Sequence, residues 1–246
     1  MGKILVSIIT PSFNSEGTIA RTIDSVLNQV YDNIEYIIVD GGSTDSTVSI
    51  IESYLGEFNG RLKYISEPDD GIYDAMNKGI RIASGTLIGI LSSNDYFEPN
   101  AVQDIVNAYD ENKAYSIVYG LQRYLLDGRE IEVVMYHHSN LPQKMMAHPA
   151  CFATKALYNK YGMFDASYKS SADYEFLWRI YDNEDVTFIP VYKIIVNFNM
   201  GGMSGTQQGY LETIRLRYSK GQISNVHYNY IRIRCFIGNF VRKVKY

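Results

Sequence analysis

The first hundred residues alternate short apolar runs with segments whose apolar positions recur at helical spacing. The apolar runs predict strands at 4–9, 34–39 and 86–91, with a shorter one at 62–65. Between these runs, apolar residues recur every three or four positions and predict helices at about 18–29, 45–55 and 71–83. Strands that alternate with helices are typical of βαβ units, whose parallel sheet is covered on both faces. The pattern therefore predicts an α/β fold with a mostly parallel sheet.

The remainder of the chain predicts a mixture of strands and helices. A helix is expected from Pro99 towards Tyr109, then strands at 116–119, 122–126 and 130–136, with a hairpin turn at 126–128. Helices follow near 154–161 and from two capping serines, Ser170 and Ser171, to about 183, before a strand-like run at 192–199. No repeat or long linker separates the two parts, so they are expected to pack as one unit.

Charge is distributed unevenly along the 246 residues. The net charge is -4, but residues 209–246 hold eight Lys or Arg against one acid, Glu212, which makes this segment +7. Such a tail suggests nucleic acid or an anionic membrane surface as a partner. The residues before this segment give no sign of nucleic-acid binding. Apolar residues among the charges, such as Ile231 and Phe236, favour an amphipathic helix docked on anionic lipid. A helix packed on the body with a solvated basic face is the equal alternative.

The cysteines and the N-terminus predict a cytoplasmic protein. Cys151 and Cys235 lie far apart, beside apolar residues and without metal-type spacing, so reduced structural thiols are expected. The chain has no apolar run of about 20 residues, and Met-Gly-Lys leads directly into the first strand rather than into a signal peptide.

Polar and acidic residues follow the ends of two predicted strands. The run that ends at Leu91 is followed by Ser92-Ser93-Asn94-Asp95, and the run that ends at Val39 is followed by Asp40. In open α/β sheets, ligands bind outside the carboxyl ends of the strands. These residues therefore predict a site for a polar ligand, either cationic or a nucleotide.

Two further segments carry candidate chemistry beside these strand ends. The turn from Thr10 to Asn14 could offer main-chain donors and a flat apolar surface to a nucleotide, although an ordinary strand-to-helix connection explains it too. Asp40 could accept the imide hydrogen of uracil, or it could simply form an Asp turn or a helix cap. In the segment 67–79, Asp70 could cap the helix, and Asp74 and Lys78 form an i,i+4 pair.

Three motifs in this order resemble family 2 glycosyltransferases of the GT-A fold. They are the stretches Val6 to Asn14, Ile37 to Asp45 and Gly85 to Phe97. The run Asp70 to Gly79 is similar to the bacterial branch that builds O-antigen and capsule repeat units. The resemblance implies a Rossmann-like fold with three segments: a nucleotide-sugar-binding half at 1–98, an acceptor-binding and catalytic half at 99–205, and basic C-terminal helices at 206–246.

The resemblance also implies a donor site, most often for a UDP-sugar. The nucleoside would be held by Pro11, Ser12, Phe13, Asn14 and Asp40, with Asp70, Asp74 and Lys78 near the phosphates or the donor sugar.

Ser93, Asn94 and Asp95 take the position of the family's Asp-x-Asp motif, which binds Mg²⁺ or Mn²⁺ on the donor diphosphate. This chain departs from the motif because Ser93 and Asn94 are neutral, so Asp95 is the only carboxylate there. The alternative is a strand-ending turn with Asp95 as a cap.

The stretch Ser170 to Arg179 is similar to the family's acidic helix. The resemblance implies that Asp173 is the general base, while Ala172 replaces the usual Glu. A first-turn Asp is also stabilised by the helix dipole, which leaves a structural role open. His148 is expected to lie between the halves, either at the acceptor pocket or as a structural histidine.

The glycine-containing loop around Gly202 and Ser204 is expected to close over the diphosphate.

The predicted function is an inverting transfer of sugar from a UDP-sugar to a glycan acceptor, in cell-surface polysaccharide synthesis. A lipid-linked acceptor would place the protein at the inner face of the plasma membrane. One alternative is a non-catalytic nucleotide-sugar-binding protein, suggested by Ser93 and Ala172. Another is a nucleotidyltransferase, which would need a Gly-rich loop where residues 11–17 contain one glycine.

Overall fold

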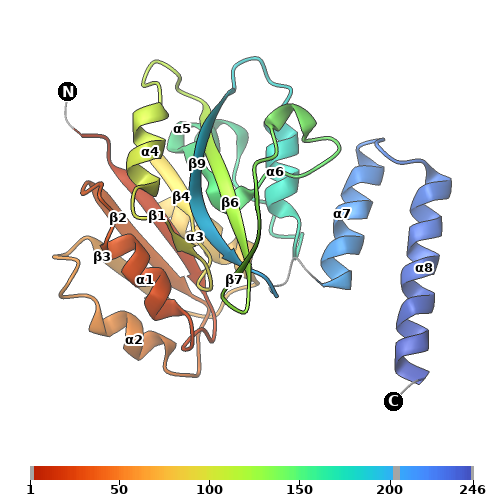
Figure 1. The fold of residues 1–246 in the computed structure, drawn as a ribbon, viewed down its shortest axis with the longest axis horizontal. Helices are drawn as coiled ribbons and strands as arrows, with labels where there is room; N and C mark the ends of the chain where they lie inside the picture. Colours follow the sequence, from red (N-terminus) through yellow and green to blue (C-terminus); the bar gives the residue numbers. More distant parts are fainter. Residues whose placement is uncertain (1–2, 202–205, 245–246) are drawn as a thin grey trace.

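A twisted mixed sheet forms the centre of the computed structural model, which describes residues 3–201 and 206–244 (Figure 1). The predicted loop residues Gly202 and Ser204 lie outside these ranges. The strands are β1 Val6–Ser12, β2 Ile34–Asp40, β3 Leu62–Ser66, β4 Leu87–Ile90, β5 Tyr96–Phe97, β6 Ser116–Leu126, β7 Arg129–Val134, β8 Cys151–Thr154 and β9 Thr187–Asn199. The helices are α1 Ile19–Leu27, α2 Thr47–Ser53, α3 Ile72–Ile82, α4 Ala101–Ala108, α5 Lys155–Tyr161, α6 Ala172–Ile180, α7 Gln207–Ser219 and α8 Asn225–Val244, with short 3₁₀ turns at His138–Asn140 and His148–Ala150.

The two parts of the chain share one sheet. The strand order is β3-β2-β1-β4-β8-β6-β9-β5, and β7 pairs with the outer part of β6. Strands β3, β2, β1 and β4 are parallel, whereas β8 runs antiparallel to both β4 and β6. The registers align Ser12, Asp40 and Ser66 across the ends of β1, β2 and β3. The polar ends of the parallel strands therefore meet at one edge.

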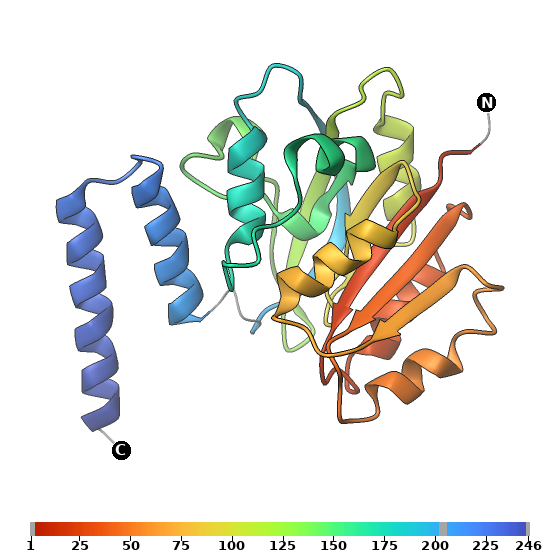
Figure 2. The ribbon, with the colours of Figure 1, turned by 180° about the vertical axis from the view of Figure 1, so that it is seen from behind.

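Helices cover both faces of this sheet. Figure 2 shows α3, α5 and α6 on one face, and Figure 1 shows α1, α2 and α4 on the other. Successive strand residues point to opposite faces, so Ile8 enters one buried cluster and Ile9 enters the other. Helix α3 approaches β1 closely, because a Cβ on Gly79 would lie 2.4 Å from Cγ2 of Ile9.

The predicted strands and helices of the first hundred residues are confirmed to within a few residues. The predicted hairpin is also confirmed, since Asp127 and Gly128 have φ values of 49° and 76°, as a two-residue type I′ turn requires.

The structure differs from the sequence predictions at β6 and β8. The two strands predicted at 116–119 and 122–126 are one continuous strand, β6, with an irregular register near Gly120. The missing side chain there makes room for the neighbouring strand, since a Cβ on Gly120 would lie 2.4 Å from Cγ1 of Ile195. Strand β8 has only four residues and was not predicted, because so short a run shows no distinct period.

The last two helices, α7 and α8, form a hairpin beside the sheet domain (Figure 1). Within 3–201 and 206–244, no helix is both long enough and apolar enough to cross a bilayer. The cysteines are free, as predicted, and Cys151 is buried.

Candidate active site

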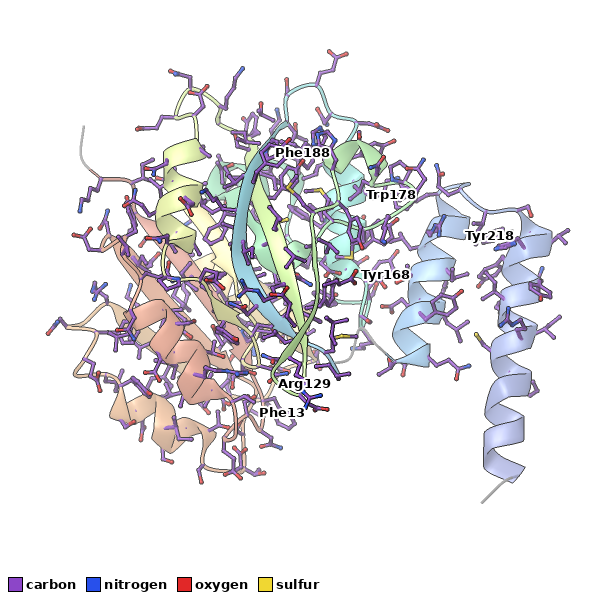
Figure 3. All side chains as sticks on the ribbon, in the orientation of Figure 1. Phe13, Arg129, Tyr168, Trp178, Phe188 and Tyr218 are labelled. Atoms are coloured by element: carbon purple, nitrogen blue, oxygen red, sulfur yellow. The ribbon has the colours of Figure 1, made fainter. Side chains whose placement is uncertain are left out.

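The loop after β1 lies against the loop after β2. Asn14 Oδ1 accepts a hydrogen bond from the Thr44 amide at 2.9 Å, and the Asn14 amide donates to Ser43 Oγ at 2.8 Å. Asn14 takes a left-handed φ of 45°. Phe13 leaves 61% of its surface exposed and projects near the edge of the molecule (Figure 3).

Two neighbours of Phe13 are buried. Pro11 lies within β1, and Ser12 is 4% exposed. The Ser12 hydroxyl is buried without a hydrogen-bond partner among the described residues. A buried hydroxyl that lacks a partner can bind a polar group of a ligand at low cost in desolvation.

Asp40 organises the loop that follows β2. Its carboxylate is fully buried and accepts hydrogen bonds from the amides of Gly42 and Ser43 at 3.1 and 2.9 Å. The hydroxyls of Ser43 and Ser66 also donate to it, the latter at 2.7 Å. This geometry matches the Asp turn that the sequence left open. Direct contact between Asp40 and a base stays a prediction.

Helix α3 begins beside this loop with a different cap from the one expected. Gly71 is the N-cap residue and has no side chain, so Asp70 does not cap the helix. Instead, Asp69 Oδ1 accepts the Gly71 amide at 2.9 Å, and the Asp70 amide points to Asp74 Oδ2 at 3.3 Å. A Cβ on Gly41 would lie 2.5 Å from Asp69 Oδ2, which explains the glycine at that position.

Lys78 lies on the same side of α3 as Asp74. Its ammonium group contacts Glu67 at 2.9 Å and Asp74 at 3.5 Å, so the predicted i,i+4 pair is part of a three-residue cluster. The Lys78 side chain is 18% exposed. Its cation is therefore held next to the strand ends, with two carboxylates balancing the charge.

The polar loop after β4 is held by Ser15 on one side and by Asn199 on the other. Ser93 Oγ lies 2.7 Å from Ser15 Oγ, and the Asn94 carbonyl accepts the Asn199 side-chain amide. Asp95 is 2% exposed and accepts the Asn199 main-chain amide at 2.9 Å. Burial raises the pKa of Asp95 to about 7, although this hydrogen bond and the Arg21 charge act in the opposite direction. Asp95 therefore binds the end of β9 rather than facing solvent.

The residues of this loop do not fit a pre-formed site for Mg²⁺ or Mn²⁺. Asp95 is the one carboxylate among Ser92, Ser93, Asn94 and Asp95, and its burial favours the neutral form. Throughout the described ranges, no group of three or more His, Cys, Asp or Glu is arranged to hold a metal ion. Hard divalent cations require several oxygen ligands. A metal-binding role for Asp95 stays a prediction.

Asp173 lies in the first turn of α6, where it meets helix α3. The Tyr73 hydroxyl donates to Asp173 Oδ1 at 2.9 Å across a separation of 100 residues, and the Tyr174 amide donates to the same oxygen at 2.9 Å. Tyr73 is 5% exposed, and burial together with the Asp173 charge raises the pKa of its phenol. The phenol therefore stays protonated, and Oδ2 of Asp173 accepts no hydrogen bond from the described residues.

The sequence pattern did not single out Tyr73, because the candidate chemistry of this segment lay in its acids and its lysine. A signal was available, since Tyr73 follows the helix start directly and lies between the apolar Ile72 and the acidic Asp74. The pattern gave no indication that its partner would be Asp173.

His148 is buried near Asp173. It is 6% exposed and its ring packs edge-on against Phe164, with centroids 5.4 Å apart. Burial lowers the pKa of His148, and the Asp173 charge acts in the opposite direction. His148 is therefore a neutral side chain packed beside the Asp173 position. Its contact with an acceptor stays a prediction.

A carboxylate from α7 holds the loop that precedes Asp173. Glu212 accepts the Lys169 amide at 2.9 Å and the Ser170 amide at 2.6 Å. Ser171 is the N-cap residue, but its hydroxyl forms no cap and instead contacts Thr213 Oγ1 at 3.0 Å. The expectation that these serines cap α6 through their side chains is therefore wrong for Ser171. Helix α7 supplies the polar contacts at this end of α6.

The chain is similar to known glycosyltransferases and polysaccharide synthases. The family model described as Glycosyl transferase family 2 matches residues 7–180. A PGL/p-HBAD biosynthesis glycosyltransferase of Mycobacterium bovis is 26% identical over 214 residues, covering 84% of this chain and 81% of the relative. Chondroitin synthase of Escherichia coli is 30% identical over 200 residues, covering 78% of this chain but only 28% of the synthase.

A solved structure has the same fold. S. aureus TarS 1–349 in complex with UDP-GlcNAc superposes with a TM-score of 0.70 at 20% identity, over 93% of this chain and 70% of that one. A longer TarS structure is matched over 43% of its length, so this chain spans less than half of it. At this identity the superposition supports the GT-A fold and nothing finer.

Proposed function

Because the chain belongs to glycosyl transferase family 2, we propose that it transfers one sugar from a UDP-sugar to a hydroxyl of a glycan acceptor, with inversion at the anomeric carbon. The UDP-GlcNAc bound to TarS supports a UDP-sugar donor, and the name of chondroitin synthase supports a glycan acceptor. Membership of the family favours an enzyme over the non-catalytic binding protein that the sequence left open.

The donor would bind at the edge where the parallel strands end. The unpartnered Ser12 hydroxyl and the exposed Phe13 ring offer a polar and a flat apolar contact to a nucleoside. Asp40 would act by holding the loop after β2 in place. Asp70 just before α3, and Asp74 and Lys78 on α3, would lie near the diphosphate and the donor sugar.

Asp173 would act as the general base. With Oδ1 bonded to Tyr73 and to its own helix, Oδ2 remains to accept the proton of the acceptor hydroxyl. As that proton leaves, the acceptor oxygen forms a bond to the anomeric carbon, the bond from that carbon to the diphosphate breaks, and UDP departs on the opposite face. The Tyr73–Asp173 hydrogen bond carries this proposal, because it joins the donor-side helix α3 to the predicted base.

The acceptor would be a glycan of a cell-surface polysaccharide. A glycan carried on a lipid would place the reaction at the inner face of the plasma membrane, in the synthesis of a cell-surface polysaccharide. His148, buried beside Asp173, would line the acceptor side.

The substitution Asp173→Asn tests the base. We expect kcat to fall by about 10²–10⁴-fold, because proton transfer by a positioned side chain contributes about that factor. The dissociation constant for UDP, measured by calorimetry, should stay within about twofold of the wild-type value. The assay measures UDP release from a panel of UDP-sugars in the presence of glycan acceptors.

The control is Asp182→Asn, an exposed acid just beyond the other end of α6. It should leave both measurements unchanged. If Asp173→Asn releases UDP at the normal rate, the assignment of the base is wrong.

A further inference from the structure

The outer side of α8 carries a line of exposed apolar residues. Val226, Tyr230 and Ile233 are 81%, 56% and 60% exposed. They are spaced by four and then three positions, which places them on one face of the helix. The sequence of the same helix continues this spacing at Ile237, Phe240 and Val244. The exposed side chains of Val226, Tyr230 and Ile233 form a continuous apolar face, which is typical of an interaction site.

The opposite side of α8 packs on α7, which fixes the direction of the apolar face. The rings of Tyr218 and Tyr228 stack with centroids 4.4 Å apart, and Figure 3 labels Tyr218 between the two helices. Ile231 is 9% exposed, and the Gln207 side chain donates to the Cys235 carbonyl at 2.7 Å. Because this side holds the contacts with α7, the line through Val226 and Ile233 points away from the protein.

The charge around this face has one sign. From residue 213 to residue 246 the chain contains eight Lys or Arg and no Asp or Glu. Arg232 and Arg234 are exposed and lie about 100° to either side of Ile233 around the helix. A second copy of α8 would bring cations against cations, whereas helices that pair through such an apolar line usually carry opposite charges beside it. The complementary partner is an anionic surface.

We propose that α8 lies in the headgroup region of an anionic lipid bilayer, with the face of Val226, Tyr230 and Ile233 directed into the lipid. Arginines on both sides of the apolar face can reach anionic headgroups while their alkyl stems stay apolar. Such binding combines burial of apolar area with attraction to anionic lipid, so it weakens in high salt.

Docking would also orient the catalytic residues. Helix α8 packs on α7, and Glu212 of α7 binds the main-chain amides of Lys169 and Ser170. Asp173 follows Ser170 by three positions in the sequence. In this respect the inference rests on the proposed function, because it places the acceptor side next to a membrane that would carry a lipid-linked glycan. The binding of α8 to lipid does not itself depend on sugar transfer.

Flotation of the full chain with vesicles tests the docking. One set of vesicles is pure phosphatidylcholine, and the other contains 30 mol% phosphatidylglycerol, about the anionic content that gives a strong surface potential. We expect the partition coefficient to be at least about tenfold higher on the anionic vesicles and to fall by a similar factor in about 0.5 M salt.

Two variants separate the apolar face from the charges. Ile233→Asp should lower partitioning at least about tenfold by placing a carboxylate in the apolar face. Arg232→Gln combined with Arg234→Gln should lower binding to anionic vesicles while leaving the residual binding to neutral vesicles unchanged. The control is Val30→Asp, since Val30 is 61% exposed but lies on the body, and it should bind as the wild type does.

Several outcomes would overturn the proposal. Equal binding to neutral and anionic vesicles, or wild-type binding by both α8 variants, would contradict it. A wild-type dimer that becomes monomeric in Ile233→Asp, without vesicle binding, would assign the face to a second copy of the chain.

Failure of docking and failure of the proposed function remain distinguishable. Asp173→Asn should float as the wild type does, and Ile233→Asp should release UDP normally with a soluble acceptor. A wild-type protein that releases UDP but does not bind anionic vesicles rejects only the docking, and a wild-type protein that binds these vesicles but releases no UDP rejects only the proposed function.

Discussion

At the scale of single residues, the contact that matters most is between Tyr73 and Asp173. The two residues come from different parts of the chain, and their hydrogen bond is 2.9 Å long and partly buried. A hydrogen bond to a charged group contributes about 1.5–3 kcal/mol, roughly twice a neutral one. Tyr73 thus fixes the orientation of the carboxylate that is proposed to accept the acceptor's proton. We regard it as a positioning residue.

Replacing Tyr73 by Phe removes this hydrogen bond and little else. We expect kcat to fall by about tenfold, because the freed carboxylate samples unproductive orientations, while KM for the donor changes by less than about twofold. Steady-state kinetics of UDP release measure both quantities.

Tyr54→Phe is the matched control. Tyr54 also donates to an aspartate, Asp24 Oδ1 at 3.0 Å, but on the exposed surface between α1 and α2. The substitution Tyr54→Phe should leave kcat unchanged. Equal effects of the two substitutions would show that Tyr73 has no special role.

At the scale of elements, one buried acid joins three segments at the amino ends of the strands. Glu35 in β2 accepts hydrogen bonds from the hydroxyls of Ser7 in β1 and Ser84 in the turn before β4, and from the Gly85 amide at 3.0 Å. Burial raises the pKa of Glu35, but these hydrogen bonds outweigh burial, and the net pKa lies below its ordinary value of 4.5. The carboxylate therefore stabilises the junction in its ionised form.

The substitution Glu35→Gln should reveal this through the pH dependence of stability. A carboxyl group with a lowered pKa contributes stability that is present above its unfolded pKa and is lost as the pH falls through its folded pKa. We expect the free energy of unfolding at pH 7 to drop by about 1–3 kcal/mol. The difference from wild type should shrink below about pH 4, since the carboxyl of the unfolded chain titrates near its ordinary value of 4.5.

Urea unfolding at pH 7, 5 and 3 measures this difference. The exposed Glu111→Gln serves as the control and should match the wild type throughout. A difference that stays constant from pH 7 to 3 would contradict the ionised role of Glu35.

At the scale of the whole molecule, one sheet joins the first hundred residues to the part of the chain that follows them. Strand β8 pairs with both β4 and β6, so the loop after β4 and the helices that follow β8 belong to a single frame. Within that frame, Asn199 at the end of β9 binds Asp95, the acid expected to bind a metal. The buried carboxylate of Asp95 therefore holds the end of β9 against the loop after β4.

The metal prediction follows from this use of Asp95. Calorimetric titration of Mn²⁺ into the protein without UDP should give a dissociation constant above about 1 mM. The affinity for such ions depends on the number of charged ligands, and this loop has one. Asn94→Asp adds a second carboxylate at a partly exposed position and should strengthen Mn²⁺ binding by about tenfold.

Ser93→Ala, which adds no charge, is the control for Asn94→Asp and should leave Mn²⁺ binding unchanged. Tight binding of Mn²⁺ by the wild-type protein without UDP would show that a complete metal site forms after all.

The elements with local signals could be predicted from the sequence. Apolar periodicity identified β1 to β4 and the helices between them, because strands buried on both faces and amphipathic helices repeat over a few residues. The turn at 126–128 was predictable for the same reason, since Gly128 and Asp127 tolerate positive φ. Position at a strand end also identified Asp40 and Asp95 as candidates, although not their surroundings.

Which side chains contact one another depends on the packing of the folded chain. Tyr73 and Asp173 are 100 residues apart, and Glu212 lies 42 residues beyond Ser170, so no local pattern connects either pair. The burial of Asp95 depends on Asn199, 104 residues away, and therefore could not be inferred from the strand that precedes it. The direction of the apolar face of α8 likewise depended on which side packs on α7. Hydrogen bonds and burial are set by packing between distant segments, whereas secondary structure follows from neighbouring residues.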